Sequence, residues 1–408
     1  MFIPQDVLFI LSVLTQNNFE AFIVGGCVRD YVLGNEPKDF DITSDALPLD
    51  IKNIFEKTID TGIQHGTITV LLNKINYEVT TYRIDGEYVD NRHPESIIFT
   101  KNLTEDLSRR DFTMNALAYN PSTGLVDPFG GEDDIKTKII RGVGDPDKRF
   151  KEDALRIMRG VRFASQLDFD IEQSTLTAMQ NNAHLIKNIS VERIRDEFFK
   201  LLNSSYINKI VLLELSGVYK YFMPELKVIF SNNKILKVLK HLDKSLRFSY
   251  ILVLISINFN MKNAQDILSN FRLDNKTISQ NKLILKYFDY NFNDDRASIR
   301  KLISIINPDV LKNLVSIKFM MELAEGNLVA CKMYDNIYDQ IGDTLRKNYC
   351  YSLKDLALNG NDLKAIGVQN GREIGKYLNM ALDLVLEDPS KNNKEVLLEY
   401  VNNILQIN

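Results

Sequence analysis

The spacing of apolar and polar positions along the chain changes at about residue 145. In the first part, short β-branched or alternating runs end at Gly, Pro, Asn or Asp, a pattern that predicts strands. After Asp145, apolar residues recur three and four positions apart over long segments, which predicts helices. The chain is therefore expected to have an α+β fold in its first part, followed by an all-helical remainder.

The first module begins with an amphipathic stretch at residues 1–16, which we expect to be helical. The run AFIVGG then predicts a strand that ends in a glycine turn, and CVRDYVLG returns to helical spacing. A turn-rich stretch at 122–146 contains one strand-like piece that would close the sheet. Further strands are predicted over 39–43, 66–72 and 75–84, and long helices over 152–167 and 191–202.

The length of 408 residues predicts two to four packed domains. Apolar residues make up 45% and charged residues 25% of the chain, as in ordinary globular proteins. The first apolar residues follow no basic leader, and polar residues interrupt every apolar run before it is long enough to span a membrane. We therefore expect a cytoplasmic protein with no membrane partner, and nothing in the sequence implies a stable protein partner.

The cysteine and histidine content limits the metal chemistry. Cys27, Cys331 and Cys350 are too far apart for a recognisable zinc site or disulfide framework, so reduced, buried thiols are expected. Only four histidines are present, and they are scattered. A bound metal would therefore have to be held by oxygen atoms.

A basic stretch lies at 227–247, although the net charge of the whole chain is −4. Lys234, Lys237 and Lys240 within it follow helical spacing. This stripe is either a phosphate-contacting surface or simply a solvated helix face, and the sequence leaves both interpretations open.

The glycine turn is the first candidate for chemistry. Gly25 and Gly26 lack side chains that would keep backbone N–H groups away from a phosphate, and the helix that follows favours anions at its start. Arg29 can add a bidentate contact. The turn is therefore a candidate triphosphate site.

Three carboxylates follow on neighbouring predicted strands. Asp39 and Asp41 are two positions apart, so in a strand they would project to the same face, and Glu78 lies on the next strand but one. Adjacent carboxylates repel unless a cation joins them, and Mg²⁺ prefers oxygen ligands and substrate phosphates. These residues are the candidate catalytic and metal-binding groups for a phosphoryl transfer.

The sequence closely resembles the class II tRNA nucleotidyltransferases of the DNA polymerase β superfamily. The resemblance rests on GGCVRD with DFD, then RRDFTMNALAY at 109–119 and EDALRIMRGVRFA at 152–164, with a looser match at 356–378. It implies a head with a mixed or antiparallel sheet, which adds C, C and A to tRNA from CTP and ATP. The domains expected are a catalytic head at 1–140, a base-recognising neck at 141–200, and a tRNA-binding body and tail at 201–290 and 291–408.

The resemblance also assigns roles to single residues. It implies that Asp39 and Asp41 hold the metal, and that Gly26, Arg29 and Arg110 contact the triphosphate. Asp111 and Asn115 would lie near the ribose, whose 2′-hydroxyl distinguishes RNA from DNA building blocks.

The neck segment suggests how the base is chosen. Asp153 and Arg156, three residues apart, would be neighbours on one helix, and Arg159 and Arg162 would continue the stripe. The resemblance implies that Arg159 and Arg162 are further nucleotide contacts. Cytosine and adenine each present an amino donor beside a ring-nitrogen acceptor, and guanine and uracil present the reverse. A carboxylate accepting from the amino group, with a guanidinium donating to the ring nitrogen, would therefore select CTP and ATP.

Four alternatives remain at this point. A bacterial poly(A) polymerase shares the head motifs but is expected to carry a long basic carboxy-terminal tail. A relative that adds only CC is expected to have a shortened stretch near DGEYVDNRHP, which looks complete here and includes His93. An A-only enzyme and a catalytically silent RNA-binding protein are the other two. A phosphohydrolase activity is not expected, because no His-Asp dipeptide occurs.

Overall fold

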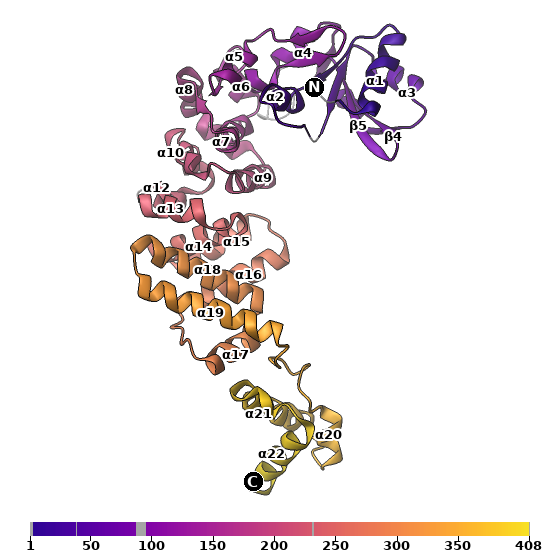
Figure 1. Ribbon diagram of the computed structural model, residues 1–408. Coiled ribbons are helices and arrows are strands. Elements are labelled where there is room, and N and C mark those ends of the chain that lie inside the picture. Colours follow the sequence, from indigo (N-terminus) through magenta and orange to yellow (C-terminus); the bar gives the residue numbers. More distant parts are fainter. Residues whose placement is uncertain (1–2, 38, 87–94, 231, 408) are drawn as a thin grey trace. The chain divides into compact units, whose positions relative to one another are not determined.

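The computed structural model describes residues 3–37, 39–86, 95–230 and 232–407. The chain divides into two compact units, Met1–Phe230 and Ser231–Asn408. The first unit contains the sheet and the first helices, and the second consists of helices within the described residues (Figure 1).

A seven-stranded mixed sheet forms the centre of the first unit, in the order β3-β4-β5-β2-β1-β8-β9. Strand β2 pairs in parallel with β5, and the other pairs of neighbours are antiparallel. Its inner positions, among them Ile23, Ile42 and Val79, are almost completely buried. The strands are β1 (Ala21–Val24), β2 (Asp41–Ser44), β3 (Thr58–Gly62), β4 (Thr67–Leu72), β5 (Ile75–Thr81), β8 (Ala118–Asn120) and β9 (Gly124–Val126).

Short helices pack on this sheet and close its connections. Helices α1 and α3 contact the strands β1, β4 and β5, and α2 follows β1 directly after the glycine turn. A separate two-stranded ribbon, β6 (Arg83–Asp85) with β7 (Ile97–Phe99), contacts α4. The helices are α1 (Gln5–Gln16), α2 (Gly26–Val32), α3 (Pro48–Ile54), α4 (Leu103–Ser108) and α5 (Gly131–Lys136).

The rest of the first unit is mostly helical. Helix α7 packs against α9, and α6 packs against α8. A parallel pair of two-residue strands, β10 (Ile139–Ile140) and β11 (Asp170–Ile171), ties the end of the head to the segment after α7. The helices are α6 (Pro146–Glu152), α7 (Leu155–Leu167), α8 (Gln173–Asn182), α9 (Val191–Leu202), α10 (Leu212–Leu215), α11 (Tyr219–Phe222) and α12 (Lys227–Phe230).

Helices of the second unit commonly begin at an Asn or Asp whose side chain accepts a hydrogen bond from a backbone N–H of the first turn, the usual way to satisfy that donor. Asp274, Asp295 and Asn307 are examples. The helices are α13 (Asn233–His241), α14 (Arg247–Asn258), α15 (Met261–Asn270), α16 (Asn275–Tyr287), α17 (Arg296–Ile305), α18 (Pro308–Glu325), α19 (Leu328–Arg346), α20 (Gly360–Ala365), α21 (Gly371–Glu387) and α22 (Lys394–Ile407).

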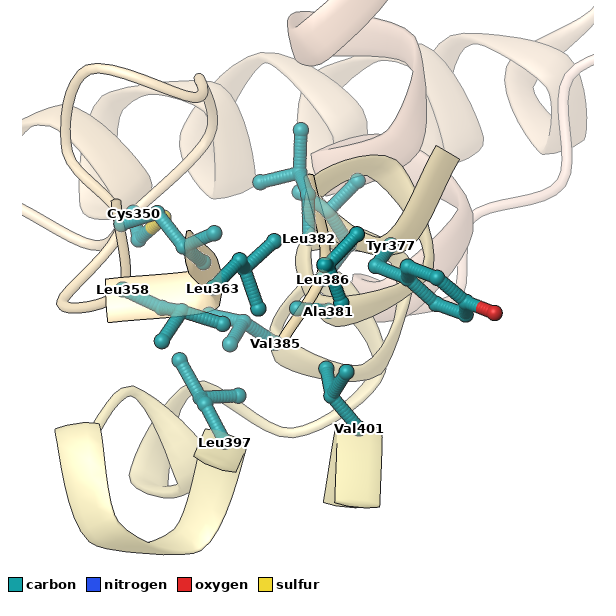
Figure 2. Packing of buried hydrophobic residues seen from close by; sticks show 12 residues of the cluster. Cys350, Leu358, Leu363, Tyr377, Ala381, Leu382, Val385, Leu386, Leu397 and Val401 are labelled. Atoms are coloured by element: carbon teal, nitrogen blue, oxygen red, sulfur yellow. The ribbon is translucent and has the colours of Figure 1, made fainter. Parts of the chain in front are cut away.

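The last three helices share a small hydrophobic core. Leu363 of α20, Val385 of α21 and Leu397 of α22 are fully buried in it (Figure 2). Cys350 and Leu358, from the segment before α20, complete the same cluster. The carboxy-terminal segment is therefore folded around apolar contacts of its own.

The predicted fold class is confirmed: a mixed sheet in the first part is followed by helices. Strands β3, β8 and β11 and the ribbon strand β7 were not predicted. Within the described residues, no helix is long and apolar enough to cross a membrane. The boundaries expected at residues 140, 200 and 290 stay predictions.

Candidate active site

A cleft of about 490 Å³ lies in the first unit. Its walls come from the β1–α2 turn, the start of β2, the motif at 109–119, and helices α7 and α9. Most of the predicted site residues meet there, from segments far apart in the sequence. The lining residues are Gly25, Gly26, Arg29, Asp41, Arg109, Arg110, Asp111, Asn115, Asp153, Leu155, Arg156, Arg159, Phe163 and Arg193.

The glycine turn forms one wall. Gly25 has φ of 78°, in the region that favours glycine, and Gly26 is the first residue of α2. A Cβ atom added to Gly25 would lie 3.1 Å from Nη1 of Arg110. The missing side chain therefore leaves room for the Arg110 guanidinium at the turn.

Asp41 is the first residue of β2 and lies opposite Val24 of β1. Asp39 lies two residues before β2 begins, so the prediction of one strand holding both carboxylates is wrong by this margin. Withdrawal from water raises the pKa of Asp41, the Arg110 charge opposes this rise, and the Asp39 charge adds to it. The two carboxylates are therefore close enough to interact electrostatically.

Glu78 lies on β5, the parallel neighbour of β2. The pairing of Ile42 with Val79 places Glu78 beside Asp41, on the same face of the sheet. Glu78 is exposed and does not line the cleft. Among the residues that the structure describes, no group of three or more His, Cys, Asp or Glu side chains is arranged to hold a metal ion.

A chain of hydrogen bonds crosses the floor of the cleft. Arg29 Nη1 donates to Asn115 Oδ1 at 2.9 Å, and Asn115 Nδ2 donates to Asp111 Oδ1 at 3.1 Å. Nε of Arg159 donates to the other oxygen of Asp111 at 2.8 Å, and Nη2 of Arg159 forms an ion pair with the same oxygen at 2.7 Å. Burial by itself would raise the pKa of Asp111, but Arg159, the hydrogen bond from Asn115 and the charge of Arg156 lower it to about 2. Asp111 is therefore a fixed, ionised acceptor.

The ring of Phe163, in α7, packs among three of the predicted arginines. The guanidinium carbons of Arg29, Arg159 and Arg162 lie 5.3, 5.4 and 3.9 Å from its centroid. Arg162 also donates to Glu197 at 2.5 Å and does not line the cleft. Its predicted role as a nucleotide contact stays a prediction.

Asp153 and Arg156 both line the cleft, but not as the predicted pair on one helix. Asp153 has extended backbone (φ −139°) between α6 and α7, so the prediction that it lies on the helix of Arg156 is wrong. Arg156 donates to Glu152 at 2.8 Å and to the carbonyl of Arg109 at 2.9 Å.

The carboxylate of Asp153 has partners of its own. Its Oδ1 accepts from the backbone N–H of Leu155 at 3.1 Å, and its Oδ2 accepts from Arg193 Nη2 at 2.8 Å. Sequence reasoning missed Arg193, Arg109, Phe163 and the contact of Glu152. Only Glu152 had a signal in the sequence, because a spacing of four residues brings side chains together on a continuous helix. In the structure Glu152 ends α6 and contacts Arg156 of α7 across the break at Asp153.

The structure also describes the three cysteines and the basic stripe of lysines that the sequence analysis singled out. The three cysteines are buried and free, as predicted, and burial raises the pKa of Cys27 to about 11. Lys234, Lys237 and Lys240 are exposed on α13, where Lys234 forms an ion pair with Glu325 at 2.5 Å. Exposure fits both interpretations of this stripe. His93 lies outside the described residues.

Three sequence families match successive parts of the chain. Residues 21–141 match the family described as Poly A polymerase head domain, and residues 168–230 match the probable RNA and SrmB-binding site of polymerase A. Residues 245–401 match tRNA nucleotidyltransferase domain 2.

Curated relatives match nearly the whole chain. The CCA-adding enzyme of Lactobacillus helveticus is 34% identical over 398 residues, which cover 97% of this chain and 96% of the relative. The CCA-adding enzyme of Pediococcus pentosaceus is 35% identical over 98% of both chains. Among solved structures, the Bacillus stearothermophilus CCA-adding enzyme in complex with CTP has a TM-score of 0.80 at 29% identity and covers 100% of both chains.

Proposed function

The chain belongs to the CCA-adding enzymes, and from this premise we propose which of its residues carry out each part of the reaction. The reaction adds C, C and A to the 3′ end of tRNA from CTP and ATP, and releases pyrophosphate. The observation that carries the assignment of residues is the cleft of about 490 Å³, which brings the glycine turn, Asp41 and the Asp153/Arg156 pair together.

Asp39 and Asp41 are the proposed metal ligands, and Mg²⁺ is the proposed ion. Their oxygen ligands suit a hard cation. The negative charge of Asp39 raises the pKa of Asp41 because the two carboxylates repel each other, and a cation between them would relieve this repulsion. When bound, Mg²⁺ would activate the 3′-hydroxyl of tRNA and stabilise charge on the leaving pyrophosphate. Glu78, beside Asp41 on the sheet, is proposed as an additional carboxylate that favours a cation near Asp41.

The triphosphate is proposed to bind at the β1–α2 turn. Gly25 and Gly26 let it approach the backbone, and Arg29 and Arg110 supply positive charge from two sides of the turn. Arg110 already interacts with Asp41, so the same guanidinium lies close to both the phosphate wall and the carboxylates.

The ribose is proposed to bind over Asp111 and Asn115. The hydrogen bonds from Arg159 and Arg29 fix these two side chains, so they present acceptors in a constant orientation. A sugar hydroxyl can donate to such a group.

Base selection is proposed to rest on Asp153 and Arg156, acting from adjacent loop and helix positions rather than from one helix face. Asp153 accepts from the amino group of cytosine or adenine, and Arg156 donates to the ring nitrogen. Arg159 lines the same cleft as a nucleotide contact. Arg162 contributes through Phe163, whose ring it stacks against at 3.9 Å.

The helical segments are proposed to hold the RNA. Residues 141–200 would form the base-recognising neck, and 201–290 and 291–408 would bind the acceptor end and elbow of tRNA by shape and phosphate contacts. The cytoplasmic location expected from the sequence stays a prediction.

Asparagine substitutions at the metal site test these assignments. Asp39→Asn and Asp41→Asn should each abolish nucleotide incorporation, because neutral amides are poor Mg²⁺ ligands, while the tRNA dissociation constant stays close to that of the parent enzyme. Asp133→Asn, at a carboxylate whose side chain is 87% exposed, is the matched control and should keep full activity. Incorporation by Asp41→Asn at the parent rate would refute the metal assignment.

A further inference from the structure

Arg193 is a cleft residue that the proposed reaction has not yet used. It lies in the first turn of α9, and its Nη2 and Nη1 donate to Oδ2 and Oδ1 of Asp153 at 2.8 and 3.4 Å. The two side chains are 28% and 17% exposed, so the ion pair is largely shielded from water. It joins positions 40 residues apart in the sequence.

Asp153 depends on such a contact for its orientation. Its backbone is extended between the end of α6 and the start of α7, so no helix fixes the direction of its side chain. Oδ1 accepts from the N–H of Leu155 at 3.1 Å and weakly from Arg193, whereas Oδ2 accepts from Arg193. A carboxylate offers about four acceptor sites, so Oδ2 can still accept a hydrogen from a base while Arg193 holds it.

Arg156 is held in a comparable way on the other side. Its Nη1 donates to Glu152 and to the carbonyl of Arg149, and its Nη2 donates to the carbonyl of Arg109. Each member of the base-reading pair therefore has a partner outside the pair. Without these partners, the opposite charges of Asp153 and Arg156, three residues apart, would be free to pair with each other. Each side chain would then have fewer hydrogen-bonding groups left for a base.

We propose that Arg193 is a positioning residue for base selection: it orients the carboxylate of Asp153 toward the base and keeps it from closing onto Arg156. The inference rests on the proposed function, since it takes Asp153 as the acceptor of the amino hydrogen of cytosine or adenine. Arg193 itself touches the carboxylate and not the reacting atoms.

The test is the ratio of kcat/KM for CTP to kcat/KM for UTP, measured on a tRNA transcript that lacks CCA. Arg193→Gln should lower this ratio about tenfold to a hundredfold, the factor expected when one buried hydrogen-bonding partner is no longer held in place. Arg193→Lys keeps one donor and the charge, and should restore part of the ratio. Arg195→Gln is the matched control on the same helix, because Arg195 pairs with Asp196 and not with Asp153.

A double-mutant cycle separates a positioning role from a structural one. If Arg193 acts through Asp153, then Arg193→Gln changes the CTP/UTP ratio in the parent enzyme but not in the Asp153→Asn background. An equal loss in both backgrounds, or a parental ratio in Arg193→Gln, would overturn the inference. If Arg193→Gln does not fold, Arg193→Lys replaces it in the cycle with the same two outcomes.

The same experiment shows whether the premise fails instead. Asp153→Asn replaces one acceptor oxygen by a donor, so it should lower the CTP/UTP ratio by itself. A parental ratio in Asp153→Asn would refute base recognition by Asp153, and the inference about Arg193 would fall with it. A lowered ratio in Asp153→Asn together with a parental ratio in Arg193→Gln would refute the inference alone.

Discussion

Arg159 of α7 donates a hydrogen bond from Nε to one oxygen of Asp111 at 2.8 Å, and its Nη2 forms an ion pair with the same oxygen at 2.7 Å. Asp111 is 7% exposed, so this contact joins a buried carboxylate of the sheet-bearing part of the first unit to the helix that carries Arg156. The cleft therefore contains an ion pair that contributes both to the stability of the fold and to the shape of the candidate site.

Removal of the guanidinium should destabilise the first unit. Arg159→Ala leaves the charge of Asp111 buried without its main partner, and we expect a loss of about 1–3 kcal/mol in the free energy of unfolding, less than for a fully buried pair because Arg159 is partly exposed. Urea unfolding measures the loss. Lys136→Ala, at a cation of the first unit whose side chain is 59% exposed, is the control and should change the value by less than about 0.5 kcal/mol. Equal stability of the two variants would contradict the role given to this pair.

The same carboxylate predicts a dependence of stability on pH. The pKa of Asp111 is about 2 in the folded protein and 3.8 ordinarily, so the folded state binds this proton less readily than the unfolded state. Its contribution to stability is complete above about pH 4 and is lost as the pH falls toward 2. The free energy of unfolding of Asp111→Asn should therefore fall less between pH 4 and pH 2 than that of the parent protein. An equal fall in both proteins would show that Asp111 titrates normally.

Two glycines should respond in opposite ways to alanine. A Cβ atom on Gly131 would lie 2.2 Å from the backbone oxygen of Thr113, in the motif that carries Asp111 and Asn115, and nothing flexible can yield there. Gly131→Ala should therefore destabilise the protein by about 1–3 kcal/mol. A Cβ atom on Gly375, inside α21, meets nothing within 4 Å, so Gly375→Ala should stabilise by about 0.5–1 kcal/mol through helix propensity. Thermal unfolding of both variants measures the two effects. If both variants were stabilised, or both destabilised, the described surroundings of the two glycines would not explain their stability.

The sequence predicted the elements whose signals are local. The strand at 21–24, the glycine turn and the helix at 26–32 follow directly from an apolar run, two glycines and a return to helical spacing. Strand β3 was missed because its middle residues are exposed on the edge of the sheet and show no alternation of apolar and polar positions. Edge strands receive little help from burial, so their sequences are weakly patterned.

The partners of Asp153 and Arg156, the proposed base-reading residues, could be predicted only in part. The helical spacing of apolar residues continues through Asp153, whereas in the structure its backbone is extended and its side chain accepts a hydrogen bond from the N–H of Leu155. Asp is a common residue at such helix starts, so a signal existed but competed with the periodicity. The contact with Arg193 had no signal, because a long-range pairing of two charged residues leaves no trace in a single sequence.

The most direct test of the central claim is incorporation of each labelled nucleoside triphosphate into a tRNA transcript lacking CCA, with Mg²⁺ present and the products sequenced. Products that end in CCA are expected, with GTP and UTP refused, because the proposed Asp153/Arg156 pair matches only the edges of cytosine and adenine. Long A tracts, addition of CC or A alone, or incorporation of UTP and GTP at rates similar to CTP and ATP would contradict the claim.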